Sequence, residues 1–525
     1  MPDTKLSPPA VNEAAAADQS TDVYAIYGAE PEVQAYAMAK YSRSALSMRE
    51  SLLELNEQKA EKFLNTFYFQ YGHRSIADLA HIALAVEKLS MLAAIALVDE
   101  QRWDGQERST RYQDYKLASW FTPSFGGNSA AAQTYRGAIE FLFAEYQQLS
   151  EKMFGFLADK TPRPAEMKQD AYERTLRARA FDISRYLLPV ATNTSLGQIV
   201  NARTLENQVS RLLSSEYPEI RKLGELLKDA ARKPAYNVNG AKLRALIEEL
   251  KLENPELAQQ ADDVLLKPVR VSPTLVKYAE ASPCEISTRS ELRQAAAELM
   301  GNAAIDPARL VDLLEPEPLE IELAATLLYG ACHFPYRQIR GAVEALSASQ
   351  RQEIVELGWK HRGKHDEMPR AFCAGQQFRF DILEDIGGFR DMHRHRRCIQ
   401  IGQDFTFAHG YDTPPEVTQA GLQAQYEAAM ARPRKAAEDI RAGLGDPAAL
   451  ETAYLIPMAY RKRTLFKMDF AEVVYISELR TGQAGHISYR RVAYEMYKAV
   501  AERYPSLAAC FRVTDVNAPV DLLKR

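Results

Sequence analysis

The spacing of apolar residues predicts a chain built mainly from amphipathic helices. Apolar side chains recur every three to four residues in several long segments, the spacing that places them on one face of a helix. Strand patterns are fewer: Phe378–Leu383 alternates in part, Val473–Leu479 is short and β-branched, and Thr110–Leu117 is typical of a loop leading into a strand. The predicted helical segments are Ala80–Leu97, Ala132–Phe156, Leu205–Ala230, Leu243–Leu266 and Val417–Leu444.

The two sides of a proline- and charge-rich stretch, Leu252–Ser272, follow one plan. Each side begins with helices and reaches a segment of basic or polar residues. A Leu-Pro or Ile-Pro dipeptide follows, at Leu188–Pro189 and Ile456–Pro457, and then an arginine-containing segment and another helix. This parallel predicts an internal duplication. The expected parts are a disordered N-terminal segment (1–20), a first domain (21–251), a linker (252–272) and a second domain (273–525).

Composition narrows the class of protein. The chain has 525 residues, of which 46% are hydrophobic and 26% charged, as in an ordinary soluble protein of more than one domain. The net charge of -5 argues against a general binder of nucleic acids or membrane surfaces. The five cysteines form no CxxC pair, so we expect a reducing cytoplasm and no disulfide framework. We see no secretory signal and no apolar run long enough for a membrane span.

The densest basic cluster is Arg394–Arg397, directly preceded by His393. Adjacent like charges repel each other unless anions lie opposite, and arginine offers bidentate hydrogen bonds to phosphate. A solvated basic face explains the cluster equally well. RNA binding fits less well, because the net charge is acidic and no aromatic residues are interleaved.

Glu107, Ser109 and Arg111 alternate along one segment, which places their side chains on one side if the segment is extended. A carboxylate, a hydroxyl and a guanidinium group together could hold a sugar hydroxyl and a phosphate. The alternative is a hydrogen-bonded surface turn.

Similarly, His73 could lie in a turn whose backbone N–H groups face a phosphate, or Ser75 could simply cap a helix.

Asn201, Arg203 and Asn207 could read the edge of a heterocycle or a pyrophosphate; alternatively, Asn201 caps a helix with a solvated face. His361 and His365 are four residues apart, but their segment is basic and offers no third ligand, so we expect no metal site. The chain has no Walker loop, GxGxxG, GxSxG or HExxH motif. If the protein is an enzyme, a cofactor is therefore expected to supply the difficult chemistry.

These motifs resemble those of the flavin-dependent thymidylate synthase family, in two tandem and diverged copies. The family signature is Arg-His-Arg, seven residues, Ser and an Arg-Tyr, preceded by a Gly-His-x-Ser/Thr element. The first half keeps Gly72–Ser75, Ser109 and Arg111–Tyr112, but has Asp99–Gln101 at the Arg-His-Arg positions. The second half keeps Arg394–Arg396.

The other signature positions are complementary in the same way. The second half has Asp404 at the Ser position and Ala453 where the first half keeps Arg185 before its Leu-Pro. The second half keeps Leu479–Arg480, which is displaced or lost around Arg211 in the first. The family's Asn-x-Arg-x-x-x-Asn element is Asn201, Arg203 and Asn207 in the first half and Asp469, Ala471 and Tyr475 in the second.

The resemblance implies an α+β fold with two tandem domains, each with helices packed on a small mixed or antiparallel sheet. It implies reductive methylation of dUMP to dTMP at a composite site, with methylenetetrahydrofolate as the carbon donor and NADPH-reduced FAD as the hydride source. The family is homotetrameric, so a duplicated chain is expected to form a homodimer, a pseudo-tetramer. A related flavin enzyme acting on another pyrimidine nucleotide, or a non-catalytic nucleotide- or flavin-binding homologue, is the alternative.

The resemblance also assigns roles to residues. Arginines would polarise the pyrimidine and fix its phosphate; those expected to be catalytic are Arg111, Arg185 and Arg394. Those expected to bind dUMP are Glu107, Ser109, Arg111, Arg185, Arg394 and Arg480. Those expected to bind FAD are His73, Ser75, Asp78 (where the family usually has Glu), Asn201, Arg203, Asn207, His395 and Arg396.

Overall fold

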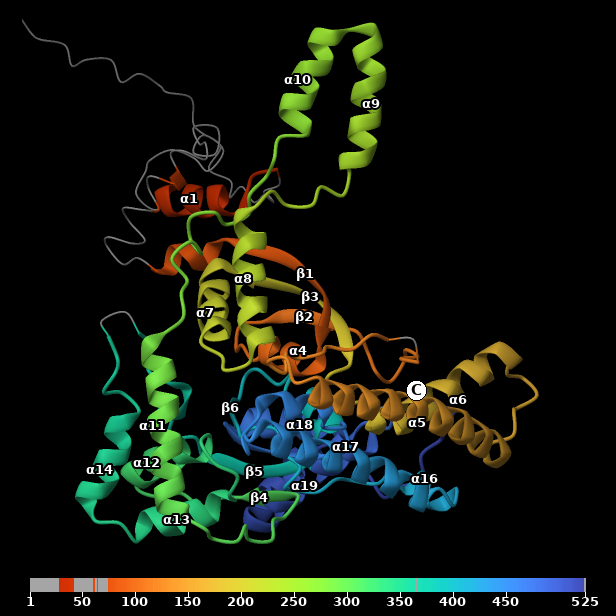
Figure 1. Cartoon of the computed structure of the whole chain (residues 1–525), viewed down its shortest axis with the longest axis vertical. Coiled ribbons are helices and arrows are strands. Elements are labelled where there is room, and N and C mark those ends of the chain that lie inside the picture. The colour runs from red at the N-terminus through yellow and green to blue at the C-terminus, as the bar shows by residue number, and fades with distance from the viewer. Residues whose placement is uncertain are drawn as a thin grey trace, which may run out of the picture.

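The first half of the chain packs helices on a three-stranded antiparallel sheet with the strand order β1-β3-β2 (Figure 1). The structure is a computed structural model that describes residues 28–41, 60–61, 64, 74–116, 118–363 and 366–523. The elements of this half are α1 (Pro31–Tyr41), η2 (Arg74–Leu79), β1 (His81–Ser90), α4 (Met91–Val98), β2 (Asp104–Glu107), α5 (Ser129–Lys160), α6 (Gln169–Ser184), η3 (Arg185–Leu187), β3 (Asn193–Asn201), α7 (Ala202–Leu213), α8 (Pro218–Arg232), α9 (Gly240–Glu253) and α10 (Pro255–Leu265).

The second half has a four-stranded antiparallel sheet with the order β4-β5-β7-β6. The predicted α+β class is therefore confirmed. The elements of this half are α11 (Pro283–Met300), β4 (Val311–Leu313), α12 (Leu319–Tyr329), α13 (Tyr336–Glu344), α14 (Ala348–Leu357), η4 (Arg370–Phe372), β5 (Phe378–Asp385), α15 (Ile386–Met392), β6 (Ile399–Gly402), α16 (Pro415–Gln419), α17 (Gln423–Leu444), η5 (Leu450–Leu455), β7 (Arg461–Met468), α18 (Phe470–Thr481), α19 (Ile487–Arg503) and η6 (Pro505–Cys510).

The segment Ala80–Leu97 was expected to be one helix, and that prediction was wrong. Its first part is strand β1, which pairs with β3 in the register Ile82↔Val200. The helix α4 begins only after Ser90, whose hydroxyl accepts a hydrogen bond from Ala93 N. Alanine-rich apolar segments fit either pattern, and strand pairing between distant segments decided the outcome here.

Val473–Leu479 was expected to be a strand but lies in helix α18. Asp469 caps this helix by accepting a hydrogen bond from Glu472 N, and Val473 and Ile476 point into the core at a spacing of three. A cap and a helical core face outweigh the β-branched composition. The other predicted helices and Phe378–Leu383 are confirmed, although three helical segments divide into the pairs α7 and α8, α9 and α10, and α16 and α17.

The two halves meet through reciprocal backbone hydrogen bonds around Pro189 and Pro457, which form an antiparallel bridge. Val190 N donates to Ile456 O at 2.9 Å, and Met458 N donates to Leu188 O at 3.0 Å. Two further bonds repeat the exchange, from Ala191 N to Tyr454 O and from Ala459 N to Tyr186 O, both 3.1 Å. This reciprocity is that of a twofold axis between duplicated segments, so the predicted duplication is visible in the backbone.

Equivalent elements extend the symmetry outward. Met91 N donates to Thr192 O in the first half, and Ile386 N donates to Tyr460 O in the second. The order strand, short helix, strand, two helices with a 3-10 helix, strand and helix occurs in both halves. One hydrophobic core crosses between them, containing residues of α4, α5 and β3 together with residues of α15, α17 and η5.

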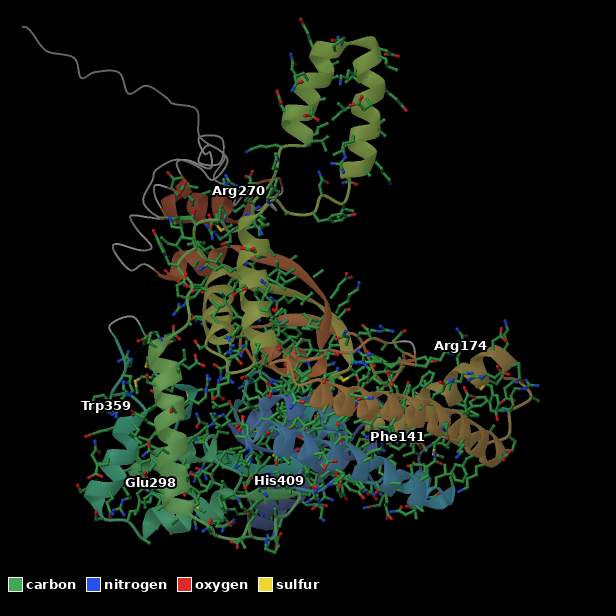
Figure 2. The ribbon with its side chains drawn as sticks, viewed as in Figure 1. Phe141, Arg174, Arg270, Glu298, Trp359 and His409 are labelled. Carbon is green, nitrogen blue, oxygen red and sulfur yellow. The ribbon has the colours of Figure 1, made fainter. Side chains whose placement is uncertain are left out.

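The sheets differ in what covers them. All eight residues of β5 are buried. Its apolar side chains pack with those of α18 and α19, and the block α11–α14, near Glu298 and Trp359 in Figure 2, packs beside the second sheet. In the first sheet, Ala83 and Ile199 face solvent.

The hairpin α9–α10 projects away from both sheets (Figure 1) and includes part of the expected linker. Within the described ranges, we find no helix with the length and apolar character needed to span a membrane.

Candidate functional site

A cluster of arginines and carboxylates lies where strand β2 of the first half meets helix α15 of the second. Glu107 ends β2, and Arg390 of α15 forms an ion pair with its carboxylate. Arg394, just beyond α15, places Nη2 3.8 Å from the other carboxylate oxygen. Both cations therefore come from the second half, although the carboxylate comes from the first.

Arg111 lies beside this pair and is fixed by three hydrogen bonds. Its Nε donates to Asp182 Oδ1 (3.0 Å), its Nη1 to the Tyr489 hydroxyl (3.1 Å) and its Nη2 to Ala484 O (2.8 Å). Burial acts to lower the pKa of Arg111, but the neighbouring Asp182 carboxylate outweighs it and raises the pKa above its ordinary value. A guanidinium group has five N–H donors, so one on each terminal nitrogen remains available to a ligand.

Arg185 and Arg390 share one hydroxyl. Arg185 Nη1 donates to Thr110 Oγ1 at 3.3 Å, and Arg390 Nη1 donates to the same oxygen at 3.4 Å. Among the described residues, Arg185 Nη2 and Arg390 Nε are buried without a hydrogen-bond partner. Unsatisfied buried donors are costly, so these groups suit a polar ligand or a bound water.

Asp182, at the end of α6, is the carboxylate beneath this cluster. Its Oδ1 lies 3.0 Å from Arg111 Nε, 3.3 Å from Arg185 Nε and 3.1 Å from His486 Nδ1. Burial acts to raise the pKa of Asp182, but the charges of His486 and Arg185 outweigh burial and hold it well below its usual range. Asp182 is therefore an anion that aligns two of the predicted catalytic arginines.

Arg480 completes the cluster from helix α18. Its Nη1 is 3.9 Å from Asp391 Oδ1, and Arg394 Nη1 is 4.0 Å from the same atom. Its Nε donates to His395 Nε2 at 2.7 Å. Burial lowers the pKa of His395, which favours the neutral ring that accepts this bond. The structure thus places His395, expected at the flavin, in the interior behind Arg480.

A second group of predicted residues gathers at one end of the first sheet. Arg203 lies 3.5 Å from Asp78 and 3.2 Å from Glu367. Arg396 lies 3.1 Å from Asp104, whose backbone pairs with Ile199 near the end of β3. Asn201 ends β3 and caps α7, the helix that carries Asn207, and η2, which carries Ser75, contacts both α7 and β3.

These residues retain groups that suit an anionic, hydrogen-bonding cofactor. The side chains of Arg203 and Arg396 are each about one-third exposed, and Ser75 and Asn207 face solvent. Asn201 caps α7 through Thr204 N at 2.8 Å, as its alternative interpretation predicted. His73 lies outside the described residues.

The duplication relates this arginine cluster to a second position, at which the two halves exchange roles. Internal ion pairs fill that second position. Asp99 replaces the arginine corresponding to Arg394 and binds Arg370 at 2.6 Å. Asp404, at the position of Ser109, binds Arg293 at 2.9 Å. Burial acts to raise the pKa of Asp99, but the charge of Arg370 outweighs it and lowers the pKa. These ion pairs occupy the place that the sequence analysis expected to have lost its ligand-binding residues.

Sequence reasoning did not identify several members of the cluster. Thr110 lies between two predicted residues, and Asp182 precedes Arg185 at a helical spacing of three, so weak local signals existed. Nothing near Arg390, His486 or Tyr489 links them to first-half residues that are 280 or more positions away. Ser109 was identified, and its hydroxyl accepts a hydrogen bond from Arg111 N at 3.2 Å within a turn.

The chain is similar in sequence to several known proteins. It is 27% identical to a UPF0159 protein of Chlamydia muridarum, over 94% of this chain and 92% of that protein. It is 25% identical to a flavin-dependent thymidylate synthase of Clostridium tetani, over 40% of this chain and 82% of that protein. A solved structure, the flavin-dependent thymidylate synthase of Helicobacter pylori complexed with FAD and dUMP, is 16% identical over 38% of this chain and 89% of that chain, with a TM-score of 0.24.

The family of the thymidylate synthase complementing protein matches the chain in both halves, over residues 25–235 and 310–506. The two matched ranges together cover more than half of the chain, and they coincide with the halves that the backbone symmetry relates. The chain therefore belongs to the thymidylate synthase complementing protein family, in a form in which the family's domain occurs twice.

Proposed function

We propose that the protein is a flavin-dependent thymidylate synthase that methylates dUMP at C5 to give dTMP. Methylenetetrahydrofolate would supply the carbon, and FAD reduced by NADPH would supply the hydride. The observation that carries the proposal is the meeting of Arg111 and Arg185 from one half with Arg394 and Arg480 from the other. These are the residues that the family resemblance assigns to the nucleotide, and each half alone lacks part of the set.

In this proposal the accessible arginines bind the phosphate of dUMP. The Arg394 side chain is 39% exposed and that of Arg480 is 16% exposed, so both can be reached from solvent. Arginine binds phosphate oxygens bidentately and remains charged at neutral pH. Arg111 adds its two remaining N–H groups, and Glu107 and Ser109 offer oxygens to the sugar hydroxyl.

The buried arginines would act on the pyrimidine ring. Arg185 Nη2 and Arg390 Nε have no hydrogen-bond partner among the described residues, so a carbonyl oxygen of the base would satisfy them. Donors fixed in a dry site stabilise the negative charge that develops on those oxygens when C5 becomes nucleophilic. Asp182 and Thr110 keep the two guanidinium groups in place.

The flavin would lie at the end of the first sheet, held by Arg203, Arg396, Ser75, Asn201 and Asn207, with Asp78 and His73 in support. When bound, the flavin supplies the hydride for the reaction. The two partly exposed guanidinium groups suit its pyrophosphate. His395 would act from the interior, by fixing Arg480, rather than by touching the flavin.

The active form would be a homodimer with the shape of the family's tetramer. The exposed face of the first sheet supports this, because Ala83, Ala85 and Ile199 form a small apolar patch there, bordered by the polar residues Asp104 and Gln106. In the second half, the block α11–α14 lies beside the corresponding sheet. Light scattering of the purified chain would give twice the chain mass if the proposal holds, and the chain mass otherwise.

The visible absorption spectrum of the purified full-length protein tests the proposal first. Bands of oxidised flavin that shift on addition of dUMP are expected, followed by dTMP formation when NADPH and methylenetetrahydrofolate are added. Flavin without a response to dUMP would favour a related enzyme for another pyrimidine nucleotide. A colourless protein that cannot be reconstituted with FAD would contradict the proposal.

A further inference from the structure

Residues 484–489 of the second half hold the side chain of Arg111, which belongs to the first half. The backbone oxygen of Ala484 accepts from Arg111 Nη2 at 2.8 Å, and the hydroxyl of Tyr489 accepts from Nη1 at 3.1 Å. His486 lies between them in this segment and is 5% exposed. Its ring turns toward Asp182 and Tyr186.

His486 joins two residues that flank the predicted catalytic Arg185. Its Nδ1 lies 3.1 Å from Asp182 Oδ1, and its Nε2 lies 2.7 Å from the hydroxyl of Tyr186. A carboxylate only accepts hydrogen bonds, so Nδ1–H must donate to Asp182 in either charge state of the ring. The Tyr186 hydroxyl can donate to Nε2 or accept from it, and therefore fits both states.

Asp182 transmits this contact to the arginines. The same Oδ1 atom lies 3.0 Å from Arg111 Nε and 3.3 Å from Arg185 Nε. We infer that His486 is a positioning residue of the nucleotide site, which fixes the Asp182 carboxylate and through it the guanidinium groups of Arg111 and Arg185. The inference rests on the proposed function, and it names a second-half residue that holds two first-half arginines.

The symmetry-related place in the chain supports this assignment. His486 is the residue before α19, and Tyr217 is the residue before the equivalent helix α8. Tyr217 packs on Tyr454, with ring centroids 6.0 Å apart, as His486 packs on Tyr186 at 5.3 Å. Leu450 stands where Asp182 would be, three residues before Ala453, so no carboxylate exists there to hold. A histidine is thus present only beside the retained arginines.

Equilibrium binding of dUMP to the full-length protein tests the inference, because it does not depend on turnover. His486→Leu removes the donor to Asp182 and should weaken dUMP binding about tenfold to a hundredfold, the effect of losing a buried charge-assisted hydrogen bond. His486→Asn places an amide N–H near the position of Nδ1 and should recover most of the affinity. Tyr217→Phe is the matched control and should bind dUMP as the unaltered protein does.

A double-mutant cycle separates positioning from a general effect on the fold. If His486 acts through Asp182, His486→Leu should cause little further loss of affinity in an Asp182→Asn background. Independent losses in the cycle, or equal affinities for the Leu and Asn variants, would overturn the inference.

Two other outcomes have distinct meanings. If the unaltered protein itself does not bind dUMP, the proposed function fails before His486 is tested. If His486→Leu does not fold, as judged by circular dichroism, Tyr186→Phe decides instead. It removes only the hydroxyl at Nε2, and a loss of dUMP affinity is expected; unchanged affinity would overturn the inference.

Discussion

Arg111 and Arg480 lie against the same aromatic ring. Their guanidinium carbons are 5.8 and 5.4 Å from the centroid of Tyr489, within the range of a cation–π contact. One arginine comes from the first half of the chain and the other from the second. A single side chain on α19 therefore contacts one cation from each half, and a shift of one half against the other would disturb its contact with Arg111.

Replacing Arg111 or Arg394 by alanine is expected to reduce dUMP affinity by at least about tenfold each, since each removes charge-assisted hydrogen bonds to the phosphate. Calorimetric titration with dUMP measures this. If both arginines serve one site within a chain, as the proposal holds, mixing the two variant proteins should not fully restore activity. Restoration on mixing would show that the site forms between chains.

We expect one dUMP bound per chain rather than two. The symmetry-related position is filled by the ion pairs of Asp99 with Arg370 and of Asp404 with Arg293. Asp404→Ala should leave both the stoichiometry and the affinity unchanged, since this carboxylate is half exposed and serves no ligand. A stoichiometry of two, or a strong loss of affinity in this variant, would refute the claim that the second constellation is degenerate.

Arg390→Met should destabilise the fold by about 3–5 kcal/mol, the usual cost of removing one partner of a buried ion pair. The Glu107 carboxylate would keep only Arg394, whose nearest nitrogen is 3.8 Å away. Urea denaturation measures the free energy of unfolding. The double variant Glu107→Gln with Arg390→Met should recover part of the loss, because no buried charge is then left alone; no recovery would show that packing, not charge, dominates.

The pH dependence of stability should contain a contribution from His409, near the second sheet (Figure 2). Burial, aided by the positive charge of Arg463, lowers the pKa of His409 to about 3. In the unfolded chain the imidazole takes up a proton near its ordinary pKa of 6.5, and in the native chain it does not. Stability is therefore full above pH 6.5 and is lost as pH falls toward 3, at up to about 1.4 kcal/mol per pH unit.

His409→Phe tests this, because the variant has no imidazole to protonate. Its free energy of unfolding should fall less steeply than that of the unaltered protein between pH 6.5 and 3. Other groups titrate in the same range, so the difference between the two curves carries the result. Parallel curves would mean that His409 does not take part.

The duplication was predictable from the sequence, and so were several members of the arginine cluster, for identifiable reasons. Motif positions such as Arg111, Arg185 and Arg394 are local patterns, and so is the cap formed by Asn201. The contact of Arg111 with Tyr489 joins residues 378 positions apart, and no local sequence pattern predicts it. Similarly, Ala80–Leu97 fits a helix until β3 is available to pair with it.

The union of the two halves at Pro189 and Pro457 uses main-chain N–H and C=O groups, which every residue except proline carries in full. These main-chain hydrogen bonds do not depend on which side chains the two halves carry. After duplication, each copy was free to lose some of its arginines, as Asp99 in the first half and Ala453 in the second show, while the main-chain bonds between the copies stayed intact. The side chains of the two repeats could therefore diverge asymmetrically without the formation of a new interface.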